Sequence, residues 1–175
     1  MTHDTLIWIG VALILIIALF TLLMVYFFLK QDFKRRRLEI LAHDQAEILK
    51  LRFLAFERLS LLLERLSPES LILREQRHDL KCMAFHTLLL KLIRQEFNHN
   101  LAMQIYISIP TWEKIKQARE SLIKLVNQAA SSCKAEAPAL ELGRIIIENA
   151  GTETNFRFND ALNAIKREIE MYYSV

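Results

Sequence analysis

The sequence predicts an all-α protein in which an N-terminal transmembrane helix continues into a stalk and then into a compact bundle of about four to five helices. Three observations predict this fold class. A long uncharged apolar run lies near the N-terminus, the 175 residues include only three glycines and three prolines, and apolar residues recur at helical spacing. Residues 104–108 (QIYIS) and 155–158 (NFRF) alternate as strands do, but they are too short to predict a sheet. Residues 101–108 and 151–158 therefore stay open between helix, strand and loop.

The apolar run covers residues 6–29 (LIWIGVALILIIALFTLLMVYFFL) and contains no charged side chain. As a helix it would reach about 36 Å, enough to cross a hydrocarbon core of about 30 Å with some tilt. A core helix of a soluble protein rarely has so long an apolar run. A cleaved signal peptide would need a basic start and a small-residue cleavage site, whereas Asp4 precedes this run and aromatic residues end it. We expect the helix to stay attached and to span a membrane.

A basic cluster follows the apolar run and consists of Lys30, Lys34, Arg35, Arg36 and Arg37. By the positive-inside rule, residues 1–5 form a short extracytoplasmic tail and residues 30–175 lie in the cytoplasm. The cluster has two interpretations: it is a topology signal alone, or it also adheres to anionic lipid headgroups. Both interpretations keep the following domain close to the bilayer.

Beyond the basic cluster the charge is balanced. Five of the 23 basic and two of the 20 acidic residues precede Leu38, so 18 of each follow it. Nucleic-acid binding would need a clustered basic face, because phosphate contacts supply most of such affinity. We therefore expect no nucleic-acid partner, and we assign residues 30–40 to a basic juxtamembrane stalk and residues 41–175 to one cytoplasmic helical domain.

The first helix of the domain is expected to continue the membrane helix, because no glycine or proline occurs between residues 32 and 66. Ser67 and Pro68 end this helix and restart the chain, since Ser is a good N-cap and Pro fits the first helical position. One face of the helix is apolar and needs a packing partner. Its members are Leu41, Ile48, Leu49, Ala55, Phe56, Leu59, Leu62, Leu63 and Leu66.

Four further helices are predicted after a short turn. The second long helix covers residues 79–98, and residues 131–137 form the loop between a third helix, which starts near Pro110, and a fourth, which runs from Pro138 to about Asn149. Asn159 is expected to cap a fifth helix. The expected apolar positions are Met83, Phe85, Leu88, Leu89, Leu92, Ile93 and Phe97, then Trp112, Ile115, Ala118, Leu122, Leu125, Val126 and Ala129, then Leu162, Ile165, Ile169 and Tyr172.

The densest polar cluster follows Phe97. Glu96 and His99 have the Glu-x-x-His spacing of di-iron bundles, but that site needs two such pairs and two further glutamates, so we expect no metal here. Asn and His also end helices well by bonding backbone carbonyls, and a tryptophan is commonly a core anchor. The open alternative is a recognition role, for which the candidate residues are Glu96, Asn98, His99, Asn100 and Trp112.

No cofactor site is predicted. Glycines occur only at positions 10, 143 and 151, so neither a phosphate-binding loop nor a dinucleotide fingerprint can be written, and we expect no nucleotide. Cys82 and Cys133 are single cysteines in a compartment expected to be reducing, where two free thiols are the default. No metal-ligand motif and no catalytic set is visible, so the sequence favours a protein that is not an enzyme.

Three segments resemble a family of small membrane-anchored proteins of Bacteroidota-type bacteria that is classed under a domain of unknown function. They are residues 56–74 (FERLSLLLERLSPESLILR), 88–108 (LLLKLIRQEFNHNLAMQIYIS) and 112–130 (WEKIKQARESLIKLVNQAA). The likeness covers most of the chain, including the anchor. It implies a bacterial inner-membrane location and brings no activity or active-site residue with it.

The expected function is that of a membrane-anchored interaction or scaffold protein, whose exposed helix faces or coiled-coil stalk bind a protein partner or a second copy. Two alternatives stay open. A stator-like structural stalk shares the plan of one anchor followed by charged helix, although the prolines at 68, 110 and 138 favour a compact bundle over an extended rod. A metal-dependent enzyme around Glu96 and His99 is the other.

Overall fold

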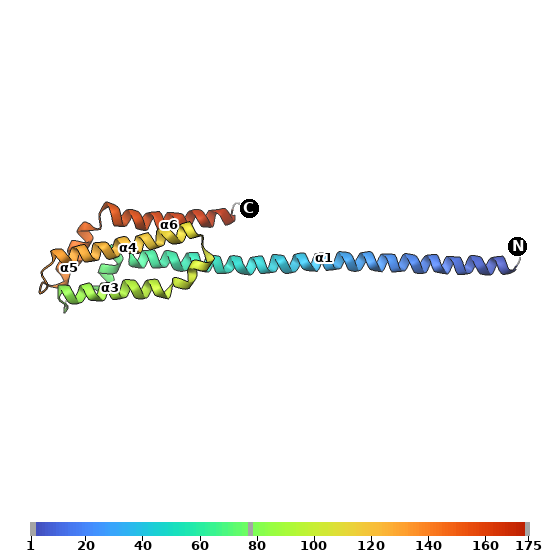
Figure 1. Ribbon diagram of the computed structural model, residues 1–175, viewed down its shortest axis with the longest axis horizontal. Coiled ribbons are helices and arrows are strands. Elements are labelled where there is room, and N and C mark those ends of the chain that lie inside the picture. Colours follow the sequence, from blue (N-terminus) through green and yellow to red (C-terminus); the bar gives the residue numbers. More distant parts are fainter. Residues whose placement is uncertain (1–2, 77–78, 174–175) are drawn as a thin grey trace. The chain divides into compact units, whose positions relative to one another are not determined.

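The computed structural model describes residues 3–76 and 79–173, and it confirms the predicted all-α class (Figure 1). No strand occurs within these two ranges. The side chains of residues 3–6, 11, 12, 33–42, 44, 152 and 173 lie outside the description, among them Lys34, Arg35, Arg36 and Arg37 of the basic cluster. The elements in chain order are α1 (His3–Leu66), α2 (Pro68–Glu75), α3 (Cys82–His99), the 3₁₀ helix η1 (Leu101–Tyr106), α4 (Ile109–Ser132), α5 (Ala139–Asn149) and α6 (Thr152–Tyr173).

The chain forms two compact units, Met1–Leu49 and Lys50–Val175, and α1 contributes to both. In the first unit, the segment Ile7–Asp32 contains an 18-residue window with a mean hydropathy of 2.9, and no residue of that window is buried within the protein. Among the described residues this is the one helix long and apolar enough to cross a bilayer. The Thr21 hydroxyl donates to the carbonyl of Ala18 over 2.8 Å, so this polar group is satisfied within the helix itself.

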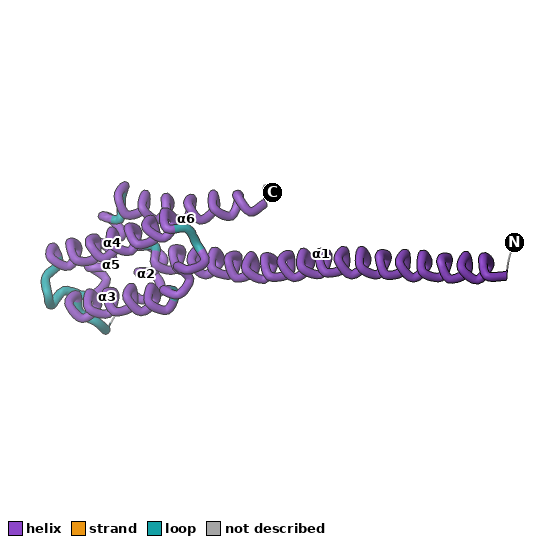
Figure 2. Tube along the Cα trace, turned by 45° about the vertical axis from the view of Figure 1, so that its right-hand side comes forward, coloured by secondary structure: helices purple, strands orange, loops and turns teal. Residues whose placement is uncertain are grey.

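The second unit is a bundle in which α4 lies between α3 and α6 (Figures 1 and 2). Every apolar position predicted for α4 is buried, from Trp112 to Ala129. The C-terminal part of α1 adds the predicted face from Ala55 to Leu66, whereas Ile48 of the same predicted face is 52% exposed. Met83, predicted in the apolar band of α3, is 49% exposed as well. Helical spacing therefore predicts buried residues correctly only where another helix packs against the apolar face.

The predicted restart at Ser67 and Pro68 is confirmed. α1 ends at Leu66, and α2 begins with Pro68 in its first turn. The Ser67 hydroxyl donates to the carbonyl of Glu64 over 2.9 Å instead of capping α2, and the Ser67 backbone N–H donates to the same carbonyl over 3.4 Å, so both bonds satisfy the end of α1. The Ser67 side chain therefore terminates one helix, and the fixed φ of Pro68 starts the next.

The N-terminus of α4 is capped by two helices together. The Ser108 hydroxyl accepts from the backbone N–H of Thr111 over 3.4 Å, as an N-cap does. Glu168 of α6, only 6% exposed, accepts from the Ser108 backbone N–H and from its hydroxyl, both over 2.7 Å. A capping box normally takes this carboxylate from the same helix. Here it joins α6 to the start of α4.

Two helix starts are predicted wrongly, and the loop predicted at residues 131–137 begins later than expected because α4 continues to Ser132. Asn159 does not begin the last helix, because α6 starts at Thr152 and includes residues 155–158. Thr154 and Phe158 are 5% and 4% exposed, so burial against the bundle extends the helix in front of Asn159. The other error is at the start of α3, which begins at Cys82 and not near Asp79. Of the open segment 101–108, the residues Leu101–Tyr106 form the 3₁₀ helix.

We expect Glu168→Ala to lower the free energy of unfolding by about 1 to 3 kcal/mol, because the Ser108 N–H and hydroxyl would lose their buried acceptor. Thermal unfolding of the full-length chain in detergent, followed by circular dichroism, measures this. Glu120→Ala is the matched control, since Glu120 lies on α4 with 65% of its side chain exposed and should change stability by less than about 0.5 kcal/mol. Equal melting temperatures for the two variants would contradict the cap.

Candidate functional site

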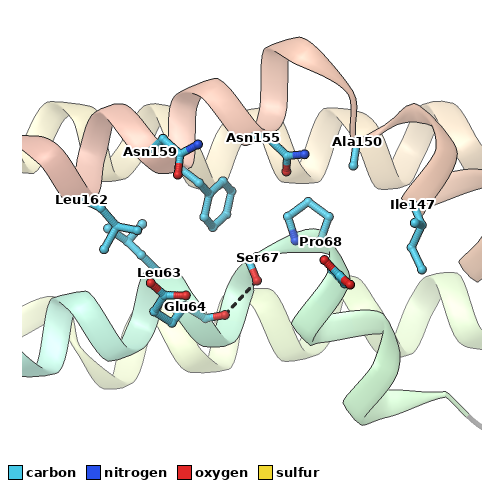
Figure 3. A pocket seen from close by; sticks show the side chains of 11 residues that line it. Leu63, Glu64, Ser67, Pro68, Ile147, Ala150, Asn155, Asn159 and Leu162 are labelled. Carbon is cyan, nitrogen blue, oxygen red and sulfur yellow. Dashed lines mark hydrogen bonds between the residues drawn. The ribbon is translucent and has the colours of Figure 1, made fainter.

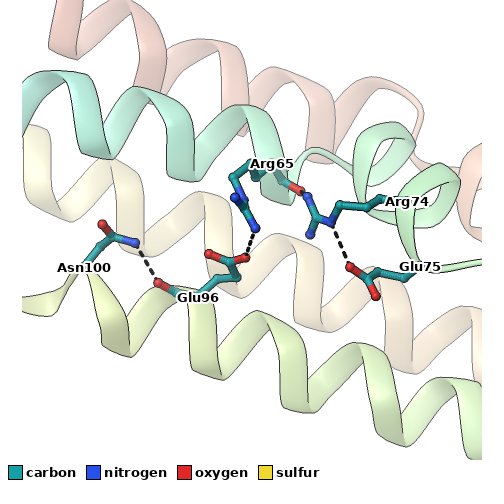
Figure 4. A network of polar contacts seen from close by, with 5 residues as sticks. All are labelled: Arg65, Arg74, Glu75, Glu96 and Asn100. Atoms are coloured by element: carbon teal, nitrogen blue, oxygen red, sulfur yellow. Dashed lines mark hydrogen bonds and ion pairs between the residues drawn. The ribbon is translucent and has the colours of Figure 1, made fainter.

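Glu96 is held in a network that joins α3 to α1 (Figure 4). The Arg65 guanidinium donates to the Glu96 carboxylate over 2.6 Å. The neighbouring Arg74 donates to the Arg65 carbonyl over 3.1 Å and to the Glu75 carboxylate over 2.8 Å. The Glu96 side chain is 22% exposed, so this ion pair is partly shielded from water. Arg65 and Glu96 are 31 residues apart in the sequence. The Glu-x-x-His spacing alone therefore could not reveal Arg65 as the partner of Glu96.

The other candidate recognition residues divide between the core and the surface. Asn100 is 7% exposed and donates from its side-chain amide to the Glu96 carbonyl over 2.9 Å, which closes the C-terminus of α3. Trp112 is 8% exposed and stacks on Phe97, with ring centroids 5.3 Å apart. Asn98 and His99 are exposed. The structure thus brings Glu96 and Asn100 together, and a recognition role for the set stays a prediction.

Metal ligands are not gathered around His99. Within residues 3–76 and 79–173, no three His, Cys, Asp or Glu side chains are placed to share an ion. His78 lies outside the described residues. The site with the Glu-x-x-His spacing therefore consists of one exposed imidazole and one carboxylate already paired with Arg65.

A cavity of about 300 Å³ lies where the end of α1 and the start of α2 meet α5 and α6 (Figure 3). Leu63, Ile147 and Leu162 are among its apolar lining residues. Its polar lining comes from Glu64, Ser67, Glu69, Asn155 and Asn159. These polar residues come from two distant parts of the chain, α1–α2 and α6, so no local motif marked them as neighbours.

An apolar groove of about 430 Å³ lies between α2 and α5. Ile72 and Gly143 face each other there, and a Cβ atom at position 143 would lie 2.9 Å from Cγ2 of Ile72. Gly143 therefore allows α2 to approach α5 closely. Leu140 and Ile147, 54% and 42% exposed, line the groove on α5, and Gln76, Arg144 and Glu148 supply its polar groups. Arg144 donates to Glu148 over 2.9 Å. We name this surface the α2–α5 groove.

Both cysteines are free thiols, as the sequence predicts. Cys82 is buried. Burial raises the pKa of the Cys82 thiol from 9.0 to about 12, with smaller contributions from a hydrogen bond to Cys133, from the charge of Cys133 and from Glu141. A thiol with this pKa stays protonated at neutral pH and reacts slowly with external electrophiles. Sequence spacing gave no sign that the two cysteines interact, because they are on different helices.

The sequence model of the family of unknown function DUF7935 matches residues 4–172. No curated protein and no solved structure matches the chain. The match extends from the apolar N-terminal helix through all helices of the bundle.

We expect Gly143→Ala to destabilise the protein by about 1 kcal/mol. Alanine stabilises a helix by about 1 kcal/mol relative to glycine, but overpacking against the stiff β-branched side chain of Ile72 costs about 1 to 3 kcal/mol. Gly151→Ala is the control, because the nearest atom to its Cβ is 3.7 Å away and stability should not fall. Thermal unfolding compares the variants, and a more stable Gly143→Ala protein would contradict close α2–α5 packing.

Alkaline pH should destabilise the fold partly through Cys82. Between pH 9 and about 12 the folded state keeps the thiol proton that the unfolded chain has lost, so the free energy of unfolding falls as pH rises. We expect a shallower fall for Cys82→Ala than for the wild type, measured from pH 8 to 11 with reductant present. Tyrosines and lysines titrate in both proteins, so the difference between the two curves isolates Cys82. Parallel curves would refute the raised pKa.

Proposed function

The chain belongs to the DUF7935 family of unknown function, and on this premise we propose that it is a membrane-anchored helical interaction or scaffold protein. Two features support the proposal. The helix Ile7–Asp32 has the length and hydropathy of a membrane anchor, and its apolar side chains are exposed, as lipid contact requires. The same α1 also supplies a buried face to the bundle, so an anchor of this kind would be covalently joined to the domain.

The proposed topology places the bundle in the cytoplasm of a bacterial cell, at the inner membrane. Lys30 is exposed with its ammonium 5.9 Å from the Tyr26 ring centroid, an arrangement suited to the interface between hydrocarbon and headgroups. The basic residues that follow Lys30 in the sequence strengthen this orientation and are available to anionic lipids. No comparable basic group precedes the apolar run.

The α2–α5 groove is the observation that carries the interaction role. Exposed apolar side chains gathered in a groove and bordered by charged groups mark a binding surface more often than scattered single residues do. Leu140 and Ile147 lie on one face of α5, and both line the groove. An amphipathic helix of a protein partner fits such a surface, with its apolar face on the exposed side chains of Leu140 and Ile147 and its polar edges near Arg144 and Glu148.

The compact packing of the second unit favours this role over a stator-like stalk. In an extended stalk the helices after the anchor would not fold back on one another, whereas α4 contacts α3, α5 and α6 here, and α5 also contacts α2 and α3. Self-association through the stalk stays a prediction, and so does a metal-dependent reaction at Glu96 and His99.

The test expresses the full-length protein in its native membrane with a photo-crosslinking residue in place of Leu140. We expect a discrete adduct with a protein partner. The same residue at Met171, which is 67% exposed on α6, is the control and should give none. Ile147→Asp should abolish the Leu140 adduct while the helical circular dichroism signal persists. Identical adduct patterns from the two positions would contradict a role for the groove.

The anchor is tested separately. We expect the intact chain to remain in the membrane pellet after alkaline carbonate extraction, because its apolar helix prefers lipid to water. A variant in which Leu13, Ile17 and Leu22 are replaced by Asp should move to the supernatant.

A reporter fused after residue 175 should be active in the cytoplasm, and periplasmic activity would refute the topology.

A further inference from the structure

The two cysteines of the chain meet at one corner of the bundle although they lie far apart in sequence. Cys82 is the first residue of α3, and Cys133 is the residue that ends α4. The segment that connects α4 to α5 runs back past the start of α3, where Lys81 forms an isolated antiparallel bridge with Pro138. Both thiols therefore belong to the junction at which α3, α4 and α5 meet.

A continuous set of hydrogen bonds links the two cysteines. The backbone N–H of Cys82 donates to the Ala137 carbonyl over 2.8 Å, and the Ala137 N–H donates to the Lys134 carbonyl over 3.0 Å. The Cys133 thiol points to the same Lys134 carbonyl, at 3.7 Å. The residue that follows Cys133 is thus part of the turn to which the backbone of Cys82 is bonded.

Two further contacts hold this turn against α3. The Ala139 N–H donates to the Leu80 carbonyl over 3.0 Å, and Lys81 forms an ion pair with Glu136. The contacts before and after Cys82 fix the segment from residue 134 to residue 139 in register with residues 80–82. These backbone bonds therefore place the segment that follows Cys133 directly beside Cys82.

The two thiols differ in access. Cys82 is fully buried, whereas Cys133 is partly exposed at the end of α4. An oxidant from solution therefore reaches Cys133 first. The interaction of Cys133 with Cys82 also contributes to the raised pKa of Cys82, which agrees with the proximity that the hydrogen bonds imply.

We propose that Cys82 and Cys133 are a redox pair that closes to an intramolecular disulfide when Cys133 is oxidised, and that this disulfide fastens the start of α3 to the end of α4. The proposal is independent of the interaction role proposed above, because it rests on the junction of three helices and not on the α2–α5 groove.

With a hydroperoxide as oxidant the reaction has two steps. The Cys133 thiolate attacks one peroxide oxygen, an S–O bond forms, the O–O bond breaks, and with hydrogen peroxide hydroxide leaves, so Cys133 becomes a sulfenic acid. The Cys82 sulfur then attacks the Cys133 sulfur, an S–S bond forms, the S–O bond breaks, and the hydroxyl leaves as water with the Cys82 proton. Overall two thiols lose two electrons and two protons, and the peroxide is reduced to water.

The disulfide should stabilise the bundle. It would close a loop from residue 82 to residue 133, and a crosslink across so long a loop reduces the entropy of the unfolded chain substantially. For a chain of this length we expect the melting temperature to rise by roughly 10 °C on oxidation. A reductant such as dithiothreitol should reverse the rise.

The test uses the full-length protein in detergent, treated with hydrogen peroxide and then unfolded and alkylated. We expect no alkylatable thiol, an intact mass lower by two hydrogens, and a protease-derived peptide pair joining Cys82 to Cys133. Two alkylatable thiols, a disulfide between two chains, or stable sulfinic acid at Cys133 with Cys82 free would each overturn the proposal.

Single variants separate the pair from general thiol oxidation. Cys133→Ser changes a partly exposed residue, should fold, and should show neither the peptide pair nor the rise in melting temperature. In Cys82→Ala the sulfenic acid of Cys133 has no resolving thiol, so a dimedone probe should label it at least tenfold more than in the wild type. If Cys82→Ala fails to fold, the Cys133→Ser protein decides: an unchanged rise in melting temperature on peroxide treatment would overturn the proposal.

Discussion

The packing of one face of α1 against the bundle is the interaction on which the rest of the structure depends. From Ala55 to Leu66 this face is buried, and Phe56 and Leu59 are among the largest fully buried side chains. Burying a leucine or phenylalanine side chain stabilises a fold by about 1.5 to 3 kcal/mol. α1 also contains the apolar segment Ile7–Asp32, so the candidate anchor and this buried face belong to the same helix.

Hydrogen bonds to other segments of the chain also hold both ends of α4 in place. At its start, Glu168 of α6 binds the Ser108 N–H and hydroxyl. At its end, the turn after Cys133 binds the backbone at Cys82. Helix faces alone can slide along one another, but bonds at specific backbone groups fix the register. The central position of α4 therefore follows from apolar burial along its length and from polar contacts at its ends.

The α2–α5 groove exists because of a single small residue. Gly143 lets α2 lie close to α5, so the side chains of Leu140 and Ile147 stand beside Ile72 and leave an apolar surface between them. A larger residue would separate the two helices. A glycine inside a helix costs about 1 kcal/mol relative to alanine, and the close packing with Ile72 offsets that cost. The same residue that weakens α5 locally thus shapes the surface proposed to bind a partner.

The sequence by itself determined the apolar N-terminal segment, the all-α class and most of the core. These features are local properties of the sequence and could be predicted from it. They are the absence of charge in residues 6–29, the prolines at positions 68, 110 and 138, and the helical periodicity of buried residues such as Leu59, Ile115 and Leu122. Only the tertiary structure decided the remainder. Burial of Thr154 and Phe158 moved the start of α6 in front of Asn159, and Leu101–Tyr106 became a 3₁₀ helix.

The candidate sites follow the same division. Arg65 pairs with Glu96, Cys82 lies beside the turn after Cys133, and Ile72 packs on Gly143, each across 31 residues or more. Contacts of this kind depend on how helices pack in space, and spacing along one helix carries no information about them. Local chemistry fixes where a helix forms, and packing between distant helices fixes which side chains meet.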